Sequence, residues 1–356
     1  MINQIEPVIT EEDIASVDKY LRSGGWLTEH SLTRKLEEEI SEYLGRSYAV
    51  AVPNGTVAIY MALKTQGLGP GDRVAVPNIT MVATINAVIW AGAEPVLVDV
   101  DENLCMSLDR LKKVNKLDAV IFVPLNGRTG NGLEIEKWCL ENEVILIEDS
   151  AHALGSEYSE KKCGSLGDMS IISFTPHKII TSGQGGLLLT DDEDSYEKMY
   201  DYKSFNREEE ASDLHKGFGL NFKFTDLQAS LLLSQLVRLD SLIESKKSIY
   251  SKYVKKTNLS EERYLEFRDF ETPWFVDYLL TEGEEQDKYR DSLLKQNIQI
   301  RKGYPPLSFQ PMFREVERTG LTYSEDIAKR IVWLPSSTNL SEDDINLVSS
   351  SLNSLN

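Results

Sequence analysis

Short apolar segments alternate with helix-like segments from about residue 45 to residue 190, and this alternation is the strongest constraint on the fold. The strand-like segments are nearly continuous apolar runs, such as RVAVP at 73–77 and AVIFVPL at 119–125. Such runs are typical of strands buried on both faces of a parallel sheet, whereas half-exposed strands alternate apolar and polar residues. The pattern therefore predicts an α/β protein with a mainly parallel mixed sheet flanked by helices.

The alternation of strand-like and helix-like segments ends after this region. Residues 226–256 read as one long helical stretch, and the chain beyond it as a smaller α+β unit. We therefore expect a large domain at 1–240 and a small C-terminal domain at 241–356, with the first 20 or so residues packing on either one. Within the large domain, strands are predicted at 49–53, 73–77, 95–100, 119–125, 144–149, 169–174 and 185–191, and helices at 32–44, 54–63, 80–92 and 133–143.

The charge of the chain limits its partners. Among 356 residues, 38 are Lys or Arg and 57 are Asp or Glu, which gives a formal charge of −19. A chain this acidic is a poor binder of nucleic acids or anionic membranes, because both need a positive surface. A small anionic ligand is still possible, since a pocket can be locally positive.

The cysteines and the apolar runs predict a cellular location. Cys105, Cys139 and Cys163 lie far apart, which fits a reducing cytoplasm and predicts neither a disulfide framework nor a metal site. The first residues do not resemble a signal peptide, and the apolar runs are much shorter than a membrane span. We expect a cytoplasmic protein.

The segment around residue 55 has the features of a phosphate site. The strand at 49–53 leads directly into the helix at 54–63, whose first turn contains Gly55 and Thr56. A helix N-terminus presents unpaired N–H groups and the positive end of its dipole, so it can hold a phosphate. Taken alone, this segment is more often an ordinary capped helix.

Two further segments place a carboxylate and a lysine where predicted strands end. Asp149 ends the strand at 144–149, and His152 follows it. Ligands of open α/β sheets bind beyond the carboxyl ends of the strands. Lys178 lies between two predicted strands in a segment with little charge, and burial would favour its neutral, nucleophilic form. Without a ligand site, Asp149 would be a helix cap, and His152 and Lys178 would be ordinary surface residues.

Together these features match the needs of pyridoxal phosphate. A lysine binds the aldehyde of this cofactor, a carboxylate keeps its pyridine nitrogen protonated, and a helix N-terminus holds its phosphate. The sequence therefore predicts a pyridoxal phosphate site that contains Lys178, Asp149 and Thr56. A Rossmann dehydrogenase is excluded, because no G-x-G-x-x-G follows an early strand.

Longer segments in the same order resemble the sugar aminotransferases of the DegT/DnrJ/EryC1/StrS group, which are fold-type I pyridoxal phosphate enzymes. They include LIEDSAHALGS at 146–156, GSLGDMSIISFTPHKIITSGQGG at 164–186 and LNFKFTDLQASLLLSQLVRLD at 220–240. The resemblance implies transfer of an amino group from L-glutamate, through pyridoxamine phosphate, to a keto group of a nucleotide-linked sugar. It also implies a homodimer with shared active sites and a place in the biosynthesis of amino sugars and surface polysaccharides such as lipopolysaccharide O-antigen.

The resemblance also implies roles for single residues. Lys178 corresponds to the lysine that binds the cofactor and moves the proton, Asp149 to the partner of the pyridine nitrogen, and Asn221 to an asparagine that reaches the phosphate of the neighbouring subunit. The expected cofactor contacts are Gly55, Thr56, Val57, Met81, Asp149, His152, Ser173, Lys178 and Asn221. The candidates for contacts to substrate are Trp26, Arg128, Arg301, Lys302 and Tyr304.

Some positions depart from the family pattern. Met81 stands where an aromatic residue usually stacks on the cofactor, and Gln184 replaces a glutamate. The usual His-Leu-Tyr-Gly-Gln reads PLNGR at 124–128, and Gly303 replaces a histidine. Because the last three departures lie in or near regions expected to face substrate, the resemblance does not fix the sugar. The commonest activity of the family implies a 4-keto-6-deoxyhexose linked to GDP, dTDP or UDP. A lyase, dehydratase or epimerase of the same fold, a 3-keto-sugar aminotransferase and a non-enzymatic regulatory relative remain as alternatives; the dehydratase branch carries a histidine in place of the lysine.

Overall fold

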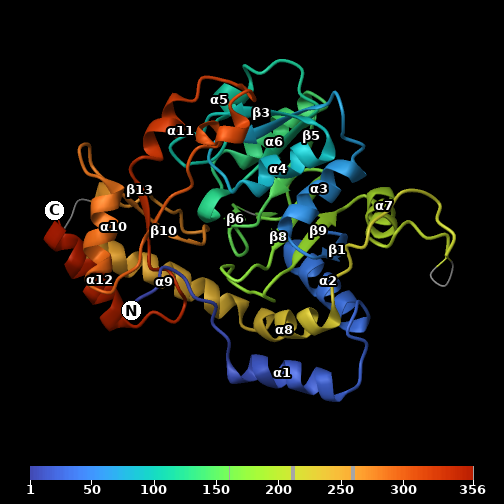
Figure 1. The fold of residues 1–356 in the computed structure, drawn as a ribbon, viewed down its shortest axis with the longest axis horizontal. Helices are drawn as coiled ribbons and strands as arrows, with labels where there is room; N and C mark the ends of the chain where they lie inside the picture. The colour runs from blue at the N-terminus through green and yellow to red at the C-terminus, as the bar shows by residue number, and fades with distance from the viewer. Residues whose placement is uncertain (160, 210–212, 258–260, 356) are drawn as a thin grey trace.

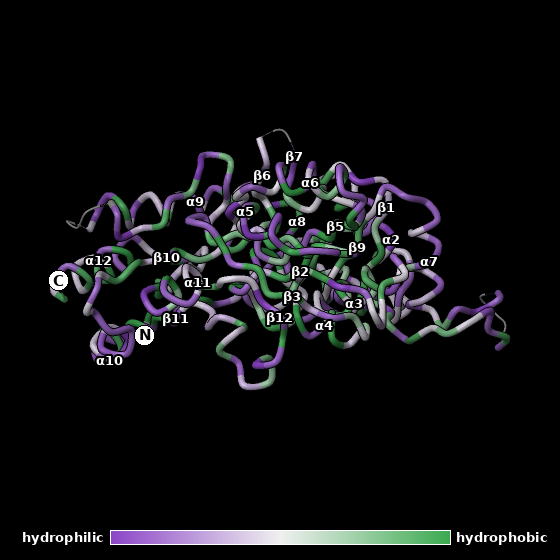
Figure 2. Tube along the Cα trace, turned by 90° about the horizontal axis from the view of Figure 1, so that it is seen from above, coloured by the Kyte–Doolittle hydropathy of each residue, from purple (hydrophilic) through white to green (hydrophobic). Residues whose placement is uncertain are grey.

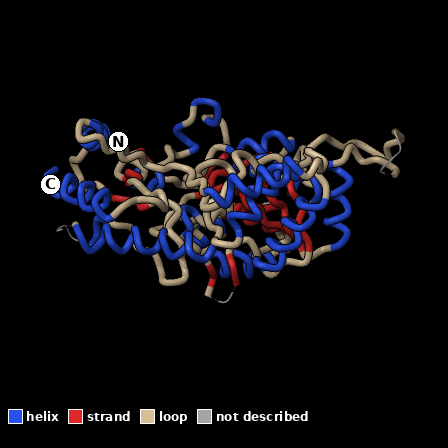
Figure 3. The backbone as a smooth tube through the Cα atoms, turned by 90° about the horizontal axis from the view of Figure 1, so that it is seen from below, coloured by secondary structure: helices blue, strands red, loops and turns tan. Residues whose placement is uncertain are grey.

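The computed structural model describes residues 1–159, 161–209, 213–257 and 261–355. Its centre is an eight-stranded sheet with the strand order β1-β9-β8-β5-β4-β2-β3-β12. Figure 3 shows these strands enclosed by helices. The strands are β1 (Tyr48–Val52), β2 (Arg73–Pro77), β3 (Glu94–Val98), β4 (Ala119–Phe122), β5 (Ile145–Asp149), β8 (Met169–Ser173), β9 (Gly186–Thr190) and β12 (Glu317–Arg318).

The direction of the strands confirms the predicted sheet. Only the two pairs that include β9, with β1 and with β8, are antiparallel, and every other neighbouring pair is parallel. The mainly parallel, mixed sheet is therefore correct. The sequence of β9 does not disclose its direction, because GLLLT is as apolar and as fully buried as the parallel strands.

Burial on both faces explains the continuous apolar runs. Val50 and Val52 of β1 belong to the core on the side of α3 (Gly55–Thr65), whereas Ala49 and Ala51 pack with α2 (Ser31–Leu44) on the other side. Figure 2 shows the hydrophobic segments gathered in this central part of the molecule. Further helices of the large unit are α4 (Ala83–Ala91), α5 (Leu108–Leu111), α6 (Gly132–Glu141) and α7 (Glu193–Lys203).

The predicted single helix at 226–256 is wrong in one respect. The structure has two helices there, α8 (Asp226–Leu236) and α9 (Leu239–Lys256), although the break contains neither glycine nor proline. α1 (Glu11–Arg22) lies along α8, as Figure 1 shows. Arg238, at the break between α8 and α9, forms an ion pair of 2.6 Å with the buried carboxylate of Asp13 in α1.

A second, smaller sheet follows α9. Its strands β10 (Val276–Leu279), β13 (Ile331–Leu334) and β11 (Arg301–Lys302) are antiparallel, and α10 (Gln286–Leu294) and α12 (Glu342–Leu355) pack near it. Figure 1 shows this unit at the left of the molecule. Shorter elements are β6 (Glu157–Tyr158), β7 (Lys161–Lys162), α11 (Thr322–Ile327) and the 3-10 turns Leu125–Gly127, Glu261–Arg263, Leu307–Phe309 and Pro311–Phe313.

The two units exchange segments, so the division at residue 240 stays a prediction. β12 comes late in the chain, yet it pairs with β3 at the edge of the large sheet. Conversely, Ile2 pairs with Ile298, and Gln4 exchanges hydrogen bonds with Leu334 and Ser336 in the small unit. Among the described residues, no helix is long and apolar enough to cross a membrane, and the three cysteines are free and buried.

Candidate active site

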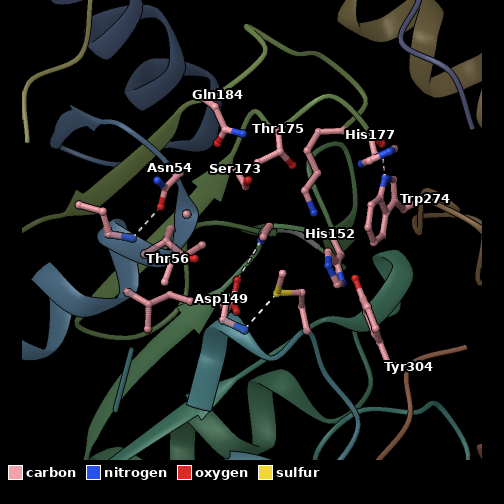
Figure 4. Close-up of a pocket in the computed structure, with 18 of the residues that line it drawn as sticks. Asn54, Thr56, Asp149, His152, Ser173, Thr175, His177, Gln184, Trp274 and Tyr304 are labelled. Carbon is pink, nitrogen blue, oxygen red and sulfur yellow. Dashed lines mark hydrogen bonds between the residues drawn. The ribbon is translucent and has the colours of Figure 1, made fainter. Parts of the chain in front are cut away.

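A cavity of about 710 Å³ opens where β5 and β8 end and α3 begins. Figure 4 shows the polar side chains that point into it. Most of the predicted site residues lie together here, although they come from distant parts of the chain. Those that line the cavity are Gly55, Thr56, Val57, Met81, Asp149, His152, Ser173, Lys178, Arg301 and Tyr304.

The N-terminus of α3 forms one wall of the cavity. Asn54 caps this helix, since its Oδ1 accepts a hydrogen bond of 3.0 Å from the N–H of Val57. The N–H groups of Gly55 and Thr56 have no partner within the described part of the chain, so they are free for an anion. A Cβ on Gly55 would stand 3.2 Å from the Cβ of Ser173, so glycine is what lets these two segments approach.

Asp149 holds a fixed orientation at the end of β5. Its Oδ2 accepts a hydrogen bond of 2.9 Å from the Thr84 hydroxyl, and its Oδ1 one of 3.3 Å from the N–H of Ala151. Burial raises the pKa of Asp149, while these hydrogen bonds and the charge of Lys178 act in the opposite direction. A buried carboxylate of this kind is suited to hold a protonated ring nitrogen.

Lys178 lies in the loop after β8, and its amino group is enclosed although the side chain keeps some exposure to the cavity. The loss of water lowers the pKa of Lys178 to about 7, against the opposing effect of the Asp149 carboxylate. The amine is therefore partly neutral near pH 7, which is the form that attacks aldehydes.

His152 and Tyr304 lie opposite the phosphate-binding end of the cavity. The His152 ring stacks on Trp274 at 4.1 Å and on Tyr304 at 5.8 Å between centroids. Burial lowers the pKa of His152 well below its usual value, so the imidazole is neutral. Its buried Nδ1 has no hydrogen-bond partner among the described residues, so it is available to a ligand.

Sequence reasoning missed Trp274, which forms another wall of the cavity. Its indole N–H donates a hydrogen bond of 2.7 Å to the carbonyl of His177, as Figure 4 shows. The Nζ of Lys178 lies 3.9 Å from the centroid of its ring. The segment PWFVDYLL at 273–280 reads as an ordinary core strand, so no local signal marks this tryptophan.

The structure contradicts the expected contact between Arg128 and substrate. The guanidinium of Arg128 is buried outside the cavity and forms an ion pair of 2.5 Å with Asp277. It also donates to the carbonyls of Leu265 and Glu266. These contacts leave it no access to the cavity.

The segment PLNGR at 124–128, which differs from the family pattern, takes part in internal packing. The side-chain amide of Asn126 donates a hydrogen bond of 2.8 Å to the same Asp277 carboxylate, and so does the indole N–H of Trp333. Trp333 in turn packs edge-on against Tyr304 at 4.8 Å. Asp277 therefore joins Asn126, Arg128 and Trp333 in a network that supports the wall of the cavity.

Three other predicted residues also lie outside the cavity. Lys302 is exposed and pairs with Asp287 at 2.7 Å. Trp26 is 70% exposed and lines a separate surface pocket. Asn221 is exposed and bridges Ser204 at the base of the protruding segment between α7 and α8, at the right of Figure 1. Within one chain, none of the three meets Lys178.

The fold and this cavity, with a lysine and a carboxylate at strand ends and free N–H groups at a helix N-terminus, define an aminotransferase of fold type I. The chain matches the model of the DegT/DnrJ/EryC1/StrS aminotransferase family over residues 7–353. It belongs to this family, and the resemblance seen in the sequence is confirmed.

Relatives of known identity agree with this membership. The chain is 32% identical over 352 residues to GDP-perosamine synthase of Escherichia coli O157:H7. The aligned region covers 98% of this chain and 96% of that protein. The solved structure of aminotransferase TlmJ from Streptoalloteichus hindustanus matches with a TM-score of 0.93 and 27% identity, over 99% and 98% of the two chains. The putative sugar aminotransferase Spr1654 from Streptococcus pneumoniae, in its PMP form, matches with a TM-score of 0.90 and 25% identity, over 100% and 99%. The family and this PMP form imply the use of pyridoxal phosphate.

Proposed function

We propose that this aminotransferase moves an amino group from L-glutamate to the keto group of a nucleotide-linked sugar, a 4-keto-6-deoxyhexose. The observation that carries the proposal is the enclosed Lys178 amine, whose pKa of about 7 suits both the binding of an aldehyde and proton transfer. The sugar class rests on the relatives named GDP-perosamine synthase.

The residues of the cavity fit pyridoxal phosphate. When bound, this cofactor supplies an aldehyde and an electron-withdrawing ring that makes the α-proton of an amino acid acidic. The free N–H groups of Gly55 and Thr56, with the Ser173 hydroxyl, would hold the phosphate. Asp149 would pair with the ring nitrogen. The unpartnered Nδ1 of His152 is the group for the phenolic oxygen.

Lys178 moves the proton of the reaction. With its pKa near 7, the Nζ can accept the α-proton of the amino donor and give it up again in the same turnover. Arg301, which is exposed at the cavity, supplies a cation for the donor carboxylate or the sugar diphosphate. Lys302 and Tyr304 stay candidates for contacts with the sugar nucleotide.

A test of the proposed reaction separates it from the lyase, dehydratase and epimerase alternatives. Enzyme loaded with pyridoxal phosphate and given L-glutamate alone should accumulate 2-oxoglutarate in an amount equal to that of its sites, because the amino group stays on the cofactor. Addition of a GDP-linked 4-keto-6-deoxyhexose should then give an amino sugar, identified by mass spectrometry. An enzyme that releases no 2-oxoglutarate is not a glutamate transaminase, and one that aminates only a 3-keto sugar has the other ring specificity.

We propose further that the enzyme is a homodimer whose subunits share active sites. Exposed aromatic and thioether side chains support this proposal, because such side chains mark interaction surfaces. Trp90 and Met81 are 50% and 42% exposed at the cavity, and Phe218 is 70% exposed on the protruding segment that ends near Asn221. On the partner subunit, Asn221 and Trp26 would complete the site.

Mixing two inactive variants tests the sharing. Lys178→Ala and Asn221→Ala protomers, each inactive alone, should regain partial activity when exchanged into one dimer, because one of its two sites then has both native residues. Sedimentation of the wild-type enzyme should give the mass of two chains. Activity that stays at the level of the separate variants, in a demonstrated mixed dimer, would contradict shared sites.

A further inference from the structure

Lys246 in α9 is buried without a counter-charge. It is 3% exposed, and its Nζ donates hydrogen bonds to the carbonyls of Trp274 (2.9 Å) and Ser336 (2.5 Å). In the described part of the chain no carboxylate forms an ion pair with it, whereas the equally buried Lys203 pairs with Glu29 and Glu37. Burial lowers the pKa of Lys246 to about 7. Burial of an amine without a counter-charge costs free energy, which indicates that the contacts of Lys246 serve a role.

Three hydrogen bonds hold Trp274 in place, and the Lys246 amine donates one of them. The carbonyl of Trp274 accepts from Lys246, its backbone N–H donates to the carbonyl of Asn126 (3.0 Å), and its indole N–H donates to His177. The ring held in this way contacts the Lys178 amine and stacks on both His152 and Phe275. Figure 4 shows the indole between His177 and His152.

Two small voids separate the two lysines. One of about 10 Å³ is lined by Lys178, Lys246 and Trp274, and another of about 20 Å³ is lined by Lys178, Lys246 and Gln235 among others. Voids of this size are close to the volume that one water needs. Removal of the Lys246 side-chain nitrogen would therefore enlarge a space directly behind Lys178.

We propose that Lys246 is a positioning residue, which keeps Trp274 against the Lys178 amine and so keeps water away from that amine. The inference rests on the proposed role of Lys178. Several titratable and charged groups surround Lys178. They are Asp149, His152, His177, Arg301 and Tyr304 at the cavity, and Glu6 and Lys246 at the voids.

The direction of the effect follows from two opposing contributions. An aromatic face attracts an ammonium group, whereas exclusion of water disfavours it. Desolvation of an enclosed lysine is the larger contribution, in line with the lowered pKa of Lys178. Loss of the Trp274 position therefore raises the Lys178 pKa towards that of an ordinary lysine.

The test measures the protonation of Lys178 directly in the full chain freed of cofactor. Competitive acetylation with acetic anhydride over a range of pH, followed by peptide mass spectrometry, gives the midpoint for Lys178. We expect Lys246→Met, of similar length but without a donor, to raise this midpoint by at least about one pH unit, which reduces labelling near pH 7 by at least about fivefold. The matched control is Lys247→Met, since the neighbouring Lys247 is only half-buried and donates to a single carbonyl, that of Asp269. The Lys178 midpoint in this variant should equal that of the wild type.

Two further variants keep the proposal falsifiable if Lys246→Met does not fold. Lys246→Gln retains an N–H donor and should give a midpoint near that of the wild type. Trp274→Leu retains Lys246 but removes the ring, and should raise the midpoint as Lys246→Met does. An unchanged midpoint in folded Lys246→Met or in Trp274→Leu would overturn the proposal. The labelling needs neither cofactor nor turnover, so this failure is distinct from a failure to release 2-oxoglutarate.

Discussion

Replacing Lys178 with alanine is expected to lower kcat by about 10⁴-fold, the upper end of what one acid–base group contributes. No other amine of the described residues lines the cavity, so no side chain there can bind the aldehyde of the cofactor in its place. The measurement is the overall transamination rate at saturating cofactor. In parallel, borohydride reduction and peptide mapping should place the cofactor on Lys178 in the wild type and nowhere in the variant.

Two control variants separate the chemistry of Lys178 from its charge. Lys178→Arg should be as inactive as the alanine variant, because a guanidinium keeps its proton and cannot attack an aldehyde. Lys161→Ala, which removes an exposed lysine on the far β6–β7 hairpin, should keep the activity of the wild type. Recovery of the cofactor on a different lysine after reduction would disprove the assignment of Lys178.

Arg128→Met is expected to destabilise the protein by about 3–5 kcal/mol while it leaves the KM for the sugar nucleotide nearly unchanged. The substitution strands the Asp277 carboxylate in the interior with Asn126 and Trp333 as its remaining donors, and an unpaired buried charge costs about this much. The loss is measured as the free energy of unfolding in urea, at one protein and cofactor concentration for all variants.

Arg301→Met is the matched counterpart of this variant. Because Arg301 is exposed at the cavity, its replacement should raise KM for glutamate or for the sugar nucleotide with little change in the free energy of unfolding. The double variant Arg128→Met/Asp277→Asn should recover part of the stability lost in Arg128→Met, since it buries no net charge. A large rise of KM in Arg128→Met at unchanged stability would restore the original expectation of a contact with substrate.

The fold was largely predictable because burial on both sides of the sheet leaves a local trace. The strand at 73–77 agrees residue for residue with β2, and Gly92 ends α4 with the positive φ of +87° that glycine favours. β12 leaves no such trace, because its two residues are exposed and polar and pair only through the backbone. The break between α8 and α9 is also set by tertiary contacts, since Arg238 turns towards Asp13 in α1.

The centre of the candidate site was predictable because motifs at strand ends share one edge of a parallel sheet. Gly55, Asp149 and Lys178 meet for that reason. Trp274 was not predictable, because its position depends on hydrogen bonds to His177 and Lys246 in other segments. The ion pair of Arg128 was not predictable either, because its partner Asp277 lies 149 residues further along the chain.

Because the two units exchange segments, neither can be completed during synthesis on the ribosome until residues from the other have emerged. Residues 2–6 emerge roughly 20–60 s before their partners at residues 298 and 334–337 at ordinary elongation rates. The walls contributed by Trp274, Arg301 and Tyr304 are late as well, and so is the edge strand β12. The nascent chain thus carries its phosphate-binding turn and its lysine long before it can enclose them, and the cavity is complete only after Trp274, Arg301 and Tyr304 have been made.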